Sequence, residues 1–216
     1  MAGAVALIEA ARPLAAQALE AAAADLEYGA GRFRIAGTDR GIGLAELAAR
    51  QPGRRIVCEH TETVKGQTWP NGCQVAEVEV DPETGAVRVA RHAALDDIGR
   101  VINPLTAESQ MHGGVAQGLG QALFEQSYYD EAGQLLTGSF MDYAMPRADQ
   151  MPGMNARFDE SVPTAMNPLG AKGAGEAGCH GAVPAIVNAV IDALGVKEID
   201  MPLTPERVWR ALQKGS

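Results

Sequence analysis

The sequence has few cysteines, few basic residues and no long apolar run, and each scarcity excludes a class of protein. Cys58, Cys73 and Cys179 include no C-x-x-C pair that could serve zinc, iron–sulfur or dithiol chemistry. We therefore expect free thiols in a reducing, cytoplasmic compartment. Eighteen Lys and Arg against 27 Asp and Glu give a net charge of −9, which would repel a phosphate backbone, so nucleic acid is not an expected partner.

Export and membrane insertion are not predicted either. The apolar start lacks a basic segment and carries Glu9 where a signal peptide would be apolar. No run of about 18 uncharged apolar residues is present, so we expect no membrane span. With 216 residues, 46% hydrophobic and 21% charged, the chain can bury a sizeable core. No repeat, low-complexity linker or charge run marks a boundary, and residues 1–216 are expected to form one domain.

The local patterns predict an α+β fold with a mixed sheet. Two alternating runs, 75–80 and 86–95, flank the turn residues DPETG at 81–85 and predict a β-hairpin. Further strands are predicted at residues 32–37, 56–63 and 155–161, and glycine- and proline-bearing loops at 141–153 and 163–176.

Helices are predicted from periodicity and from capping residues. Asn103 and Pro104 are an N-cap and a first helical residue, so a long helix is expected over 105–126. Thr204 and Pro205 similarly predict a final helix to about residue 212. The others are expected at residues 4–26, bent near Pro13, and at 43–50 and 183–194.

The 105–126 helix is rich in glycine at positions 113, 114, 118 and 120, so something must approach it closely. Gln110, Gln117 and Gln121 are seven and four residues apart and share one helical face, which suits amide recognition of a heteroaromatic or phosphate-bearing ligand. Packing of small residues between helices explains the same pattern equally well. His112 has no second His or Cys at metal-ligand spacing and is expected to be structural.

A second glycine-rich segment, NPLGAKGAGEAG, holds a single carboxylate, Glu176, just ahead of a helix. Glu176 is a general-base candidate; the alternative is that it caps the helix and pairs with Lys172. Gly173 to Gly178 also reads as G-x-G-x-x-G, with Glu198 twenty residues on, but the hydrophobic strand that a dinucleotide-binding fold requires is missing before it. Asp96 and Asp97 are a possible metal pair, although a turn is expected there.

Three stretches in order carry a resemblance: VEVDPETGAVRV with DDIGRVINP, then QMHGGVAQGLGQAL with GSFMDYAMP, then NPLGAKGAGEAG with IDMPLTPERVWRAL. Together they resemble the C-terminal part of the molybdenum-binding large subunit of the xanthine oxidase, aldehyde oxidase and carbon monoxide dehydrogenase-like hydroxylases. The resemblance implies that Glu176 is the active-site base. It also implies cofactor contacts at Gln110, His112, Gly113, Gly114, Gln117, Lys172, Gly173, Ala174 and Gly175.

The family's cofactor is molybdenum on a molybdopterin, in bacteria usually the cytosine dinucleotide form. The pterin dithiolene holds the metal, so no metal ligand is expected from this chain. The resemblance further implies hydroxylation of an aldehyde or N-heterocyclic carbon, a small-molecule substrate, with oxygen derived from water. Partner chains would supply the N-terminal half of the molybdenum subunit, iron–sulfur clusters and FAD. A non-catalytic scaffold or degenerate fragment of such a complex is the alternative, and a nicotinamide dehydrogenase is a third possibility.

Overall fold

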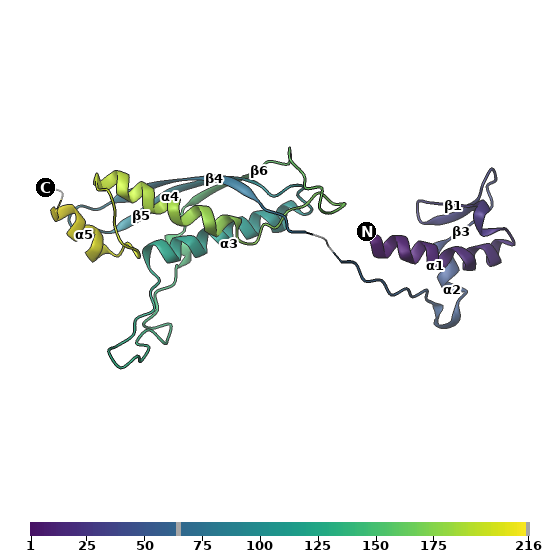
Figure 1. The fold of residues 1–216 in the computed structure, drawn as a ribbon, viewed down its shortest axis with the longest axis horizontal. Coiled ribbons are helices and arrows are strands. Elements are labelled where there is room, and N and C mark those ends of the chain that lie inside the picture. The colour runs from purple at the N-terminus through teal and green to yellow at the C-terminus, as the bar shows by residue number, and fades with distance from the viewer. Residues whose placement is uncertain (64–65, 215–216) are drawn as a thin grey trace. The chain divides into compact units, whose positions relative to one another are not determined.

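The computed structural model describes residues 1–63 and 66–214, and the chain divides into two compact units, 1–65 and 66–216. No change of composition marks the boundary between them, so local sequence patterns did not predict it. Figure 1 shows the elements of each.

The N-terminal unit packs helices on a small antiparallel sheet. Its elements are α1 (Ala2–Leu19), the short helix η1 (Ala23–Asp25), β1 (Leu26–Gly29), β2 (Arg32–Ile35), β3 (Gly41–Gly43), α2 (Leu44–Ala49) and the turn η2 (Pro52–Arg54). The strands pair in the order β1-β2-β3. Phe33, Ile42 and Leu47 are fully buried and form the centre of its core together with one face of α1.

Two expectations in this unit are wrong. The first helix ends at Leu19, because Glu20 takes a left-handed conformation and Leu26 instead pairs with Ile35 in the sheet. Residues 56–63 do not form a strand: no neighbouring strand offers them hydrogen bonds, and they belong to no regular element. The predicted strand at 32–37 and the helix at 43–50 are confirmed.

The C-terminal unit is built on the predicted hairpin. Strands β4 (Asn71–Val80) and β5 (Val87–Asp97) are antiparallel, and β6 (Gly153–Phe158) joins β5 in parallel, so the sheet is mixed, as expected. Asp81 fixes the turn by accepting hydrogen bonds from the Glu83 backbone N–H and the Thr84 hydroxyl. With helices packed on two small sheets, the α+β prediction is confirmed.

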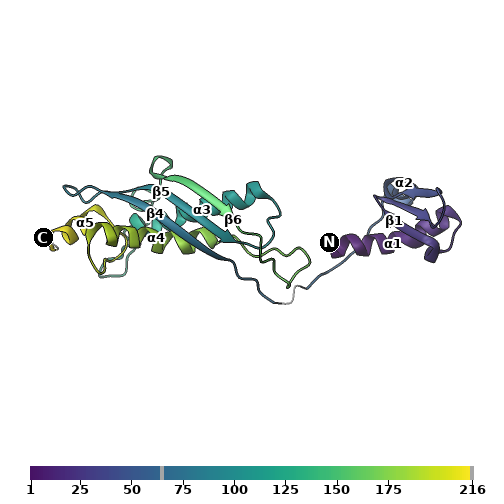
Figure 2. The same ribbon diagram turned by 90° about the horizontal axis from the view of Figure 1, so that it is seen from above.

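Helices α3 (Pro104–Leu123) and α4 (Ala177–Leu194) lie side by side on one face of this sheet (Figures 1 and 2). Asn103 caps α3 as predicted, with its Oδ1 accepting from the backbone N–H groups of Leu105 and Thr106. Ile186 and Val190 of α4 pack with Leu119 of α3 in the core, which the short helix α5 (Pro205–Lys214) completes. The long excursion between α3 and β6 contains only the short turn η3 (Ala148–Gln150).

Helix α4 begins six residues earlier than the predicted start at Val183. Its first turns contain Gly178 and Gly181, which favour a loop in isolation. In the structure Gly178 packs against α3 and Gly181 against Gln74 of β4, and these tertiary contacts hold the segment in the helix. By length and composition α4 could cross a membrane. Here its apolar side faces α3 and the sheet, which accounts for that composition.

Candidate functional site

Close packing of α3 and α4 brings two of the predicted site segments together. A β-carbon added to Gly178 would lie 2.5 Å from the Met111 carbonyl oxygen, and one added to Gly114 would lie 2.8 Å from the Cys179 nitrogen. One turn on, Gly118 faces Ala182, so the two helices run in the same direction. The start of α4, with Glu176, therefore lies beside the turn of α3 that carries Gln110 and Gly113.

Glu176 is the N-cap residue of α4, but its side chain caps nothing. The carboxylate is exposed and makes no hydrogen bond to the free N–H groups of the first turn. Lys172, the partner expected in the capping alternative, donates instead to Asp97 Oδ2 at 2.6 Å, with only 9% of its side chain exposed. That part of the alternative is wrong, and within the described residues Glu176 is left without an ion pair.

The loop before Glu176 is tied to the end of β5. The Lys172 N–H donates to the Ile98 carbonyl at 2.8 Å, and the Arg100 N–H donates to the Gly170 carbonyl at 3.0 Å. Asp97 forms the predicted turn by accepting from the Gly99 N–H at 2.9 Å. The Lys172 ammonium, and then this N–H, hold the pKa of Asp97 below its usual value. The loop that carries Glu176 is thus fixed at its base.

Three glycines beside Glu176 present an open surface. Gly113, Gly173 and Gly175 are exposed, and a β-carbon at any of them would meet nothing within 4 Å. The Gly173 N–H donates to Thr68 Oγ1 at 3.3 Å. Ala174 is half-buried, and its carbonyl accepts from the Ala177 N–H. Backbone at these positions can be approached closely by a ligand.

The predicted glutamine stripe on α3 is exposed, because Gln110, Gln117 and Gln121 all face away from the core. His112 lies on the opposite side of the helix. Its Nε2 is buried without a hydrogen bond, 3.9 Å from Glu108 Oε1, in a narrow space shared with His92 and Met154. Gly114 is covered by α4. Contacts with a cofactor at His112 and Gly114 stay predictions, while Gln110 and Gly113 are accessible.

Sequence patterns did not point to Gln74, a polar side chain beside the start of α4. The Nε2 of Gln74, on β4, donates to the Ala177 carbonyl at 3.1 Å. The Oε1 of Gln74 lies 2.9 Å from Nε2 of His92, a residue that is 2% exposed. Strand alternation could have found it, because Gln74 lies on the inward side of β4 with Ala76 and Val78.

Asp96 is buried, and the sequence did not predict its burial. It is 3% exposed, its Oδ2 finds no hydrogen-bond partner among the described residues, and burial raises its pKa to about 6. The folded state therefore holds a proton that the unfolded state has lost between about pH 4 and pH 6. Stability falls as the pH rises through this window.

We expect Asp96→Asn to raise the free energy of unfolding by about 1–3 kcal/mol at pH 7.5, because a neutral amide replaces a buried, unpaired carboxylate. The gain should shrink towards zero near pH 3, below the ordinary aspartate pKa of about 3.9, where the wild-type carboxyl is mostly protonated in both states. Urea denaturation of the full chain at the two pH values measures it. Exposed Asp149→Asn is the control, with a change within about 0.5 kcal/mol. A gain of equal size at both pH values contradicts the prediction.

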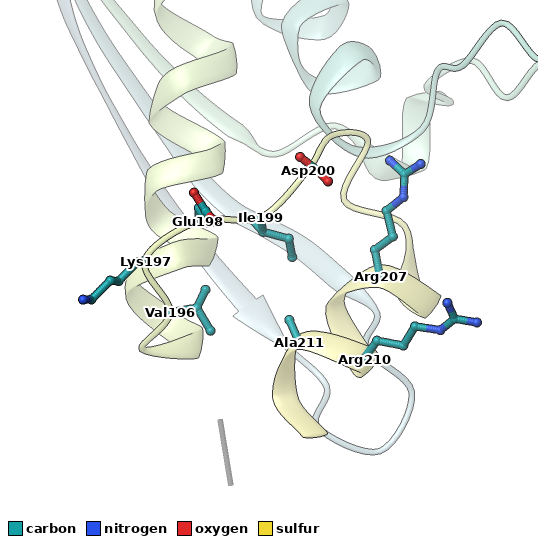
Figure 3. A pocket seen from close by; sticks show the side chains of 8 residues that line it. All are labelled: Val196, Lys197, Glu198, Ile199, Asp200, Arg207, Arg210 and Ala211. Atoms are coloured by element: carbon teal, nitrogen blue, oxygen red, sulfur yellow. The ribbon is translucent and has the colours of Figure 1, made fainter. Parts of the chain in front are cut away.

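A hollow of about 730 Å³ lies at the other end of α4, between the segment after it and α5. Its lining includes Glu198, the acid of the dinucleotide-binding alternative. The side chains of Lys197 and Arg210 point away from the hollow (Figure 3). Arg210 pairs with Glu206, and Arg207 donates to the Met201 carbonyl. No convergent set of charged groups faces a ligand there, and the G-x-G-x-x-G glycines lie at the opposite end of the helix.

Comparison with known proteins gives a family match over residues 1–152 to the molybdopterin cofactor-binding domain. The chain is 40% identical, over 97% of its length, to the 6-hydroxypseudooxynicotine dehydrogenase complex subunit gamma of Paenarthrobacter nicotinovorans. It is 36% identical, over 94% of its length, to the carbon monoxide dehydrogenase large chain of Hydrogenophaga pseudoflava. The chain spans 28% and 27% of these two relatives.

Solved structures agree with this match. A Cu,Mo-CO dehydrogenase superposes with a TM-score of 0.84 at 32% identity, covering 99% of this chain and 28% of that one. Quinoline 2-oxidoreductase from Pseudomonas putida 86 superposes with a TM-score of 0.80 at 35% identity, covering 96% of this chain and 28% of that one. The similarity therefore includes both compact units.

Proposed function

Because the chain belongs to the molybdopterin cofactor-binding domain family of the carbon monoxide dehydrogenase, xanthine dehydrogenase and aldehyde oxidoreductase large subunits, we propose that it supplies the base and part of the cofactor cleft of a molybdenum hydroxylase. The assembled enzyme would insert a water-derived oxygen into an aldehyde or N-heterocyclic substrate. Each turnover then releases two protons and two electrons. The observation that carries the proposal is Glu176, whose carboxylate has no ion pair among the described residues and lies beside the open glycines and Gln110.

The donor set of this chain fits the implied cofactor. The open surface at Gly113, Gly173 and Gly175 lets a cofactor approach closely, although the Gly113 and Gly173 N–H groups are already bonded within the chain, and the Gln110 amide can both donate to and accept from a heterocycle. Among the described residues no group of three His, Cys, Asp or Glu side chains could hold a metal. When bound, the molybdenum–pterin group supplies the redox centre for the substrate's two electrons.

The chain's own residues would have three tasks. Glu176 accepts a proton at a carboxylate oxygen as the new carbon–oxygen bond forms. The 170–175 loop, anchored by Lys172 and Asp97, keeps that carboxylate at a constant position. Gln110 orients the ring system beside it. Electrons leave through iron–sulfur clusters and FAD on partner chains, and the rest of the molybdenum subunit completes the cleft.

The native complex tests this function. We would tag this chain in its source organism, isolate the complex under mild conditions, and measure its subunits, molybdenum, iron and nucleotide. One molybdenum and one cytosine nucleotide per copy of this chain are expected, with iron on a partner. Turnover of aldehydes and N-heterocycles in H₂¹⁸O with an artificial electron acceptor should place ¹⁸O in the product. A complex without molybdenum or such turnover supports the scaffold alternative instead.

The chain on its own is expected to retain no molybdenum, because the three open glycines have no opposing surface within the described residues. It should also self-associate, since Phe140 and Met141 in the loop after α3 are 86% and 93% exposed. Metal analysis and light scattering of the purified chain measure both properties. A well-behaved monomer with stoichiometric molybdenum and pterin contradicts the prediction.

A further inference from the structure

The side chain of Gln74 connects the sheet to the first turn of α4. Its Nε2 donates to the Ala177 carbonyl at 3.1 Å across 103 positions of sequence, and Ala177 directly follows Glu176. Within the described residues this is the side-chain hydrogen bond that reaches the start of α4 from the sheet. The first two turns contain Gly178 and Gly181 and are weakly helical by themselves. An anchor there has a large effect on where the turn lies.

His92 contacts the oxygen end of the Gln74 amide. The ring Nε2 lies 2.9 Å from Gln74 Oε1, and burial lowers the pKa of His92, which favours the neutral ring. Because Gln74 Nε2 donates to a carbonyl, its Oε1 must accept, and the proton of His92 is therefore on Nε2. The reverse orientation of the amide would place Oε1 against the Ala177 carbonyl, which is repulsive. With the amide in this orientation, His92 donates to Gln74 Oε1 and holds the other end of the side chain.

Gly181 leaves the path open for this side chain. A β-carbon at position 181 would lie 2.4 Å from Gln74 Cδ and 2.6 Å from its Nε2. Any other residue there must displace the Gln74 amide or the helix. The glycine that weakens the start of α4 is therefore the one that admits its anchor.

We propose that Gln74, held by His92, is a positioning residue for Glu176: it fixes the first turn of α4 and with it the direction of the carboxylate. This inference rests on the proposed role of Glu176 as base. The anchoring itself is measurable without turnover, so the two can fail separately.

Hydrogen exchange followed by mass spectrometry tests the anchor in the full chain. Gln74→Met keeps the length of the side chain and removes both hydrogen bonds, and we expect amides in 177–182 to exchange about five- to tenfold faster. Peptides from 186–194 should be unchanged. The matched control is Gln51→Met, which removes the bond from Gln51 Nε2 to the Leu47 carbonyl in the N-terminal unit. Unchanged exchange in 177–182, or equal acceleration along all of α4, overturns the anchor.

Gly181→Ala gives an independent test, because its effect on the exchange rate should change direction when Gln74 is also replaced. In the wild-type chain the new methyl group should displace Gln74 and speed exchange in 177–182. With Gln74→Ala already present there is nothing to displace, and alanine should slow exchange because it favours helix over glycine. A double-mutant cycle measures this difference. If Gly181→Ala acts in the same direction in both backgrounds, Gln74 does not occupy the path and the proposal is wrong.

In the assembled complex, Gln74→Met should lower kcat about 10- to 100-fold by misplacing the carboxylate, with KM and molybdenum content within about twofold of wild type. A merely structural role would lower molybdenum content or stability instead and overturn the inference. Unchanged kcat in Gln74→Met, in a complex that Glu176→Gln inactivates, also overturns it while leaving the base role intact. Full activity of Glu176→Gln removes the base role alone, and the exchange results still decide the anchor.

Discussion

Glu176→Gln should lower kcat of the assembled complex by about 10²- to 10⁴-fold, which corresponds to roughly 3 to 5.5 kcal/mol of activation free energy. The amide keeps the shape of the side chain but cannot accept the proton. Neither hydrogen bonds nor ion pairs of the described residues depend on this carboxylate, so stability and molybdenum content should be unchanged.

The matched control is Glu198→Gln, an exposed acid at the far end of α4, which should leave kcat within about twofold of wild type. It also tests the dinucleotide-binding alternative, in which Glu198 would hold a ribose. If the Glu176→Gln complex retains more than about a tenth of the wild-type rate, the loss of rate is smaller than removal of a general base should cause. That result would leave this chain without a catalytic residue.

The second large expected effect is on the free energy of unfolding, and it is tested by comparing substitutions at the adjacent glycines Gly113 and Gly114. Gly114→Val should destabilise the chain by about 3 kcal/mol or more, because its side chain meets backbone atoms of Gly178 and Cys179 that cannot move aside. Gly113→Ala meets nothing within 4 Å and should be neutral or stabilising by up to about 1 kcal/mol. Urea denaturation of both variants measures the difference.

Substitutions at Gly113 and Gly114 also distinguish a glycine needed for helix packing from one needed for contact with the cofactor. In the complex, a substitution at Gly113 should reduce molybdenum content although the fold is intact, because this glycine faces the open side. Gly118→Val should behave like Gly114→Val, since a β-carbon at Gly118 would lie 2.7 Å from Ala182 Cβ. Equal stability of Gly113 and Gly114 variants would mean that the helices are not in the close contact described.

Local patterns predicted much of the fold. The hairpin, the cap at Asn103 and the short elements at 32–35 and 44–49 follow from alternation and capping chemistry, which are properties of neighbouring residues. The early start of α4 could not be predicted in the same way. Gly178 becomes helical only because α3 approaches it, and that contact joins residues more than sixty positions apart. Residues 56–63 have strand-like composition but no neighbour to pair with.

The candidate site was likewise predicted in part. The resemblance and the glycine pattern pointed to Glu176 and Gln110, and the structure brings their segments together. Pairing of Lys172 with Asp97 was not foreseen, because nearness in sequence favoured Glu176 as its partner. Gln74 escaped attention because a single polar residue on an inward strand position carries no motif. Its role depends on a helix that begins a hundred residues later.

The long separation between β4 and α4 also bears on how the protein is made. The inward side of the β4–β5 hairpin, including Val78 and Val89, is covered by Ile186 and Val190 of α4. About a hundred residues must be synthesised between the two, which takes roughly 5–20 s at typical ribosomal rates. Throughout that interval the part of the hairpin face that α4 covers stays exposed. The helix that covers it directly follows Glu176, so burial of this apolar face and placement of Glu176 occur in the same step of biosynthesis.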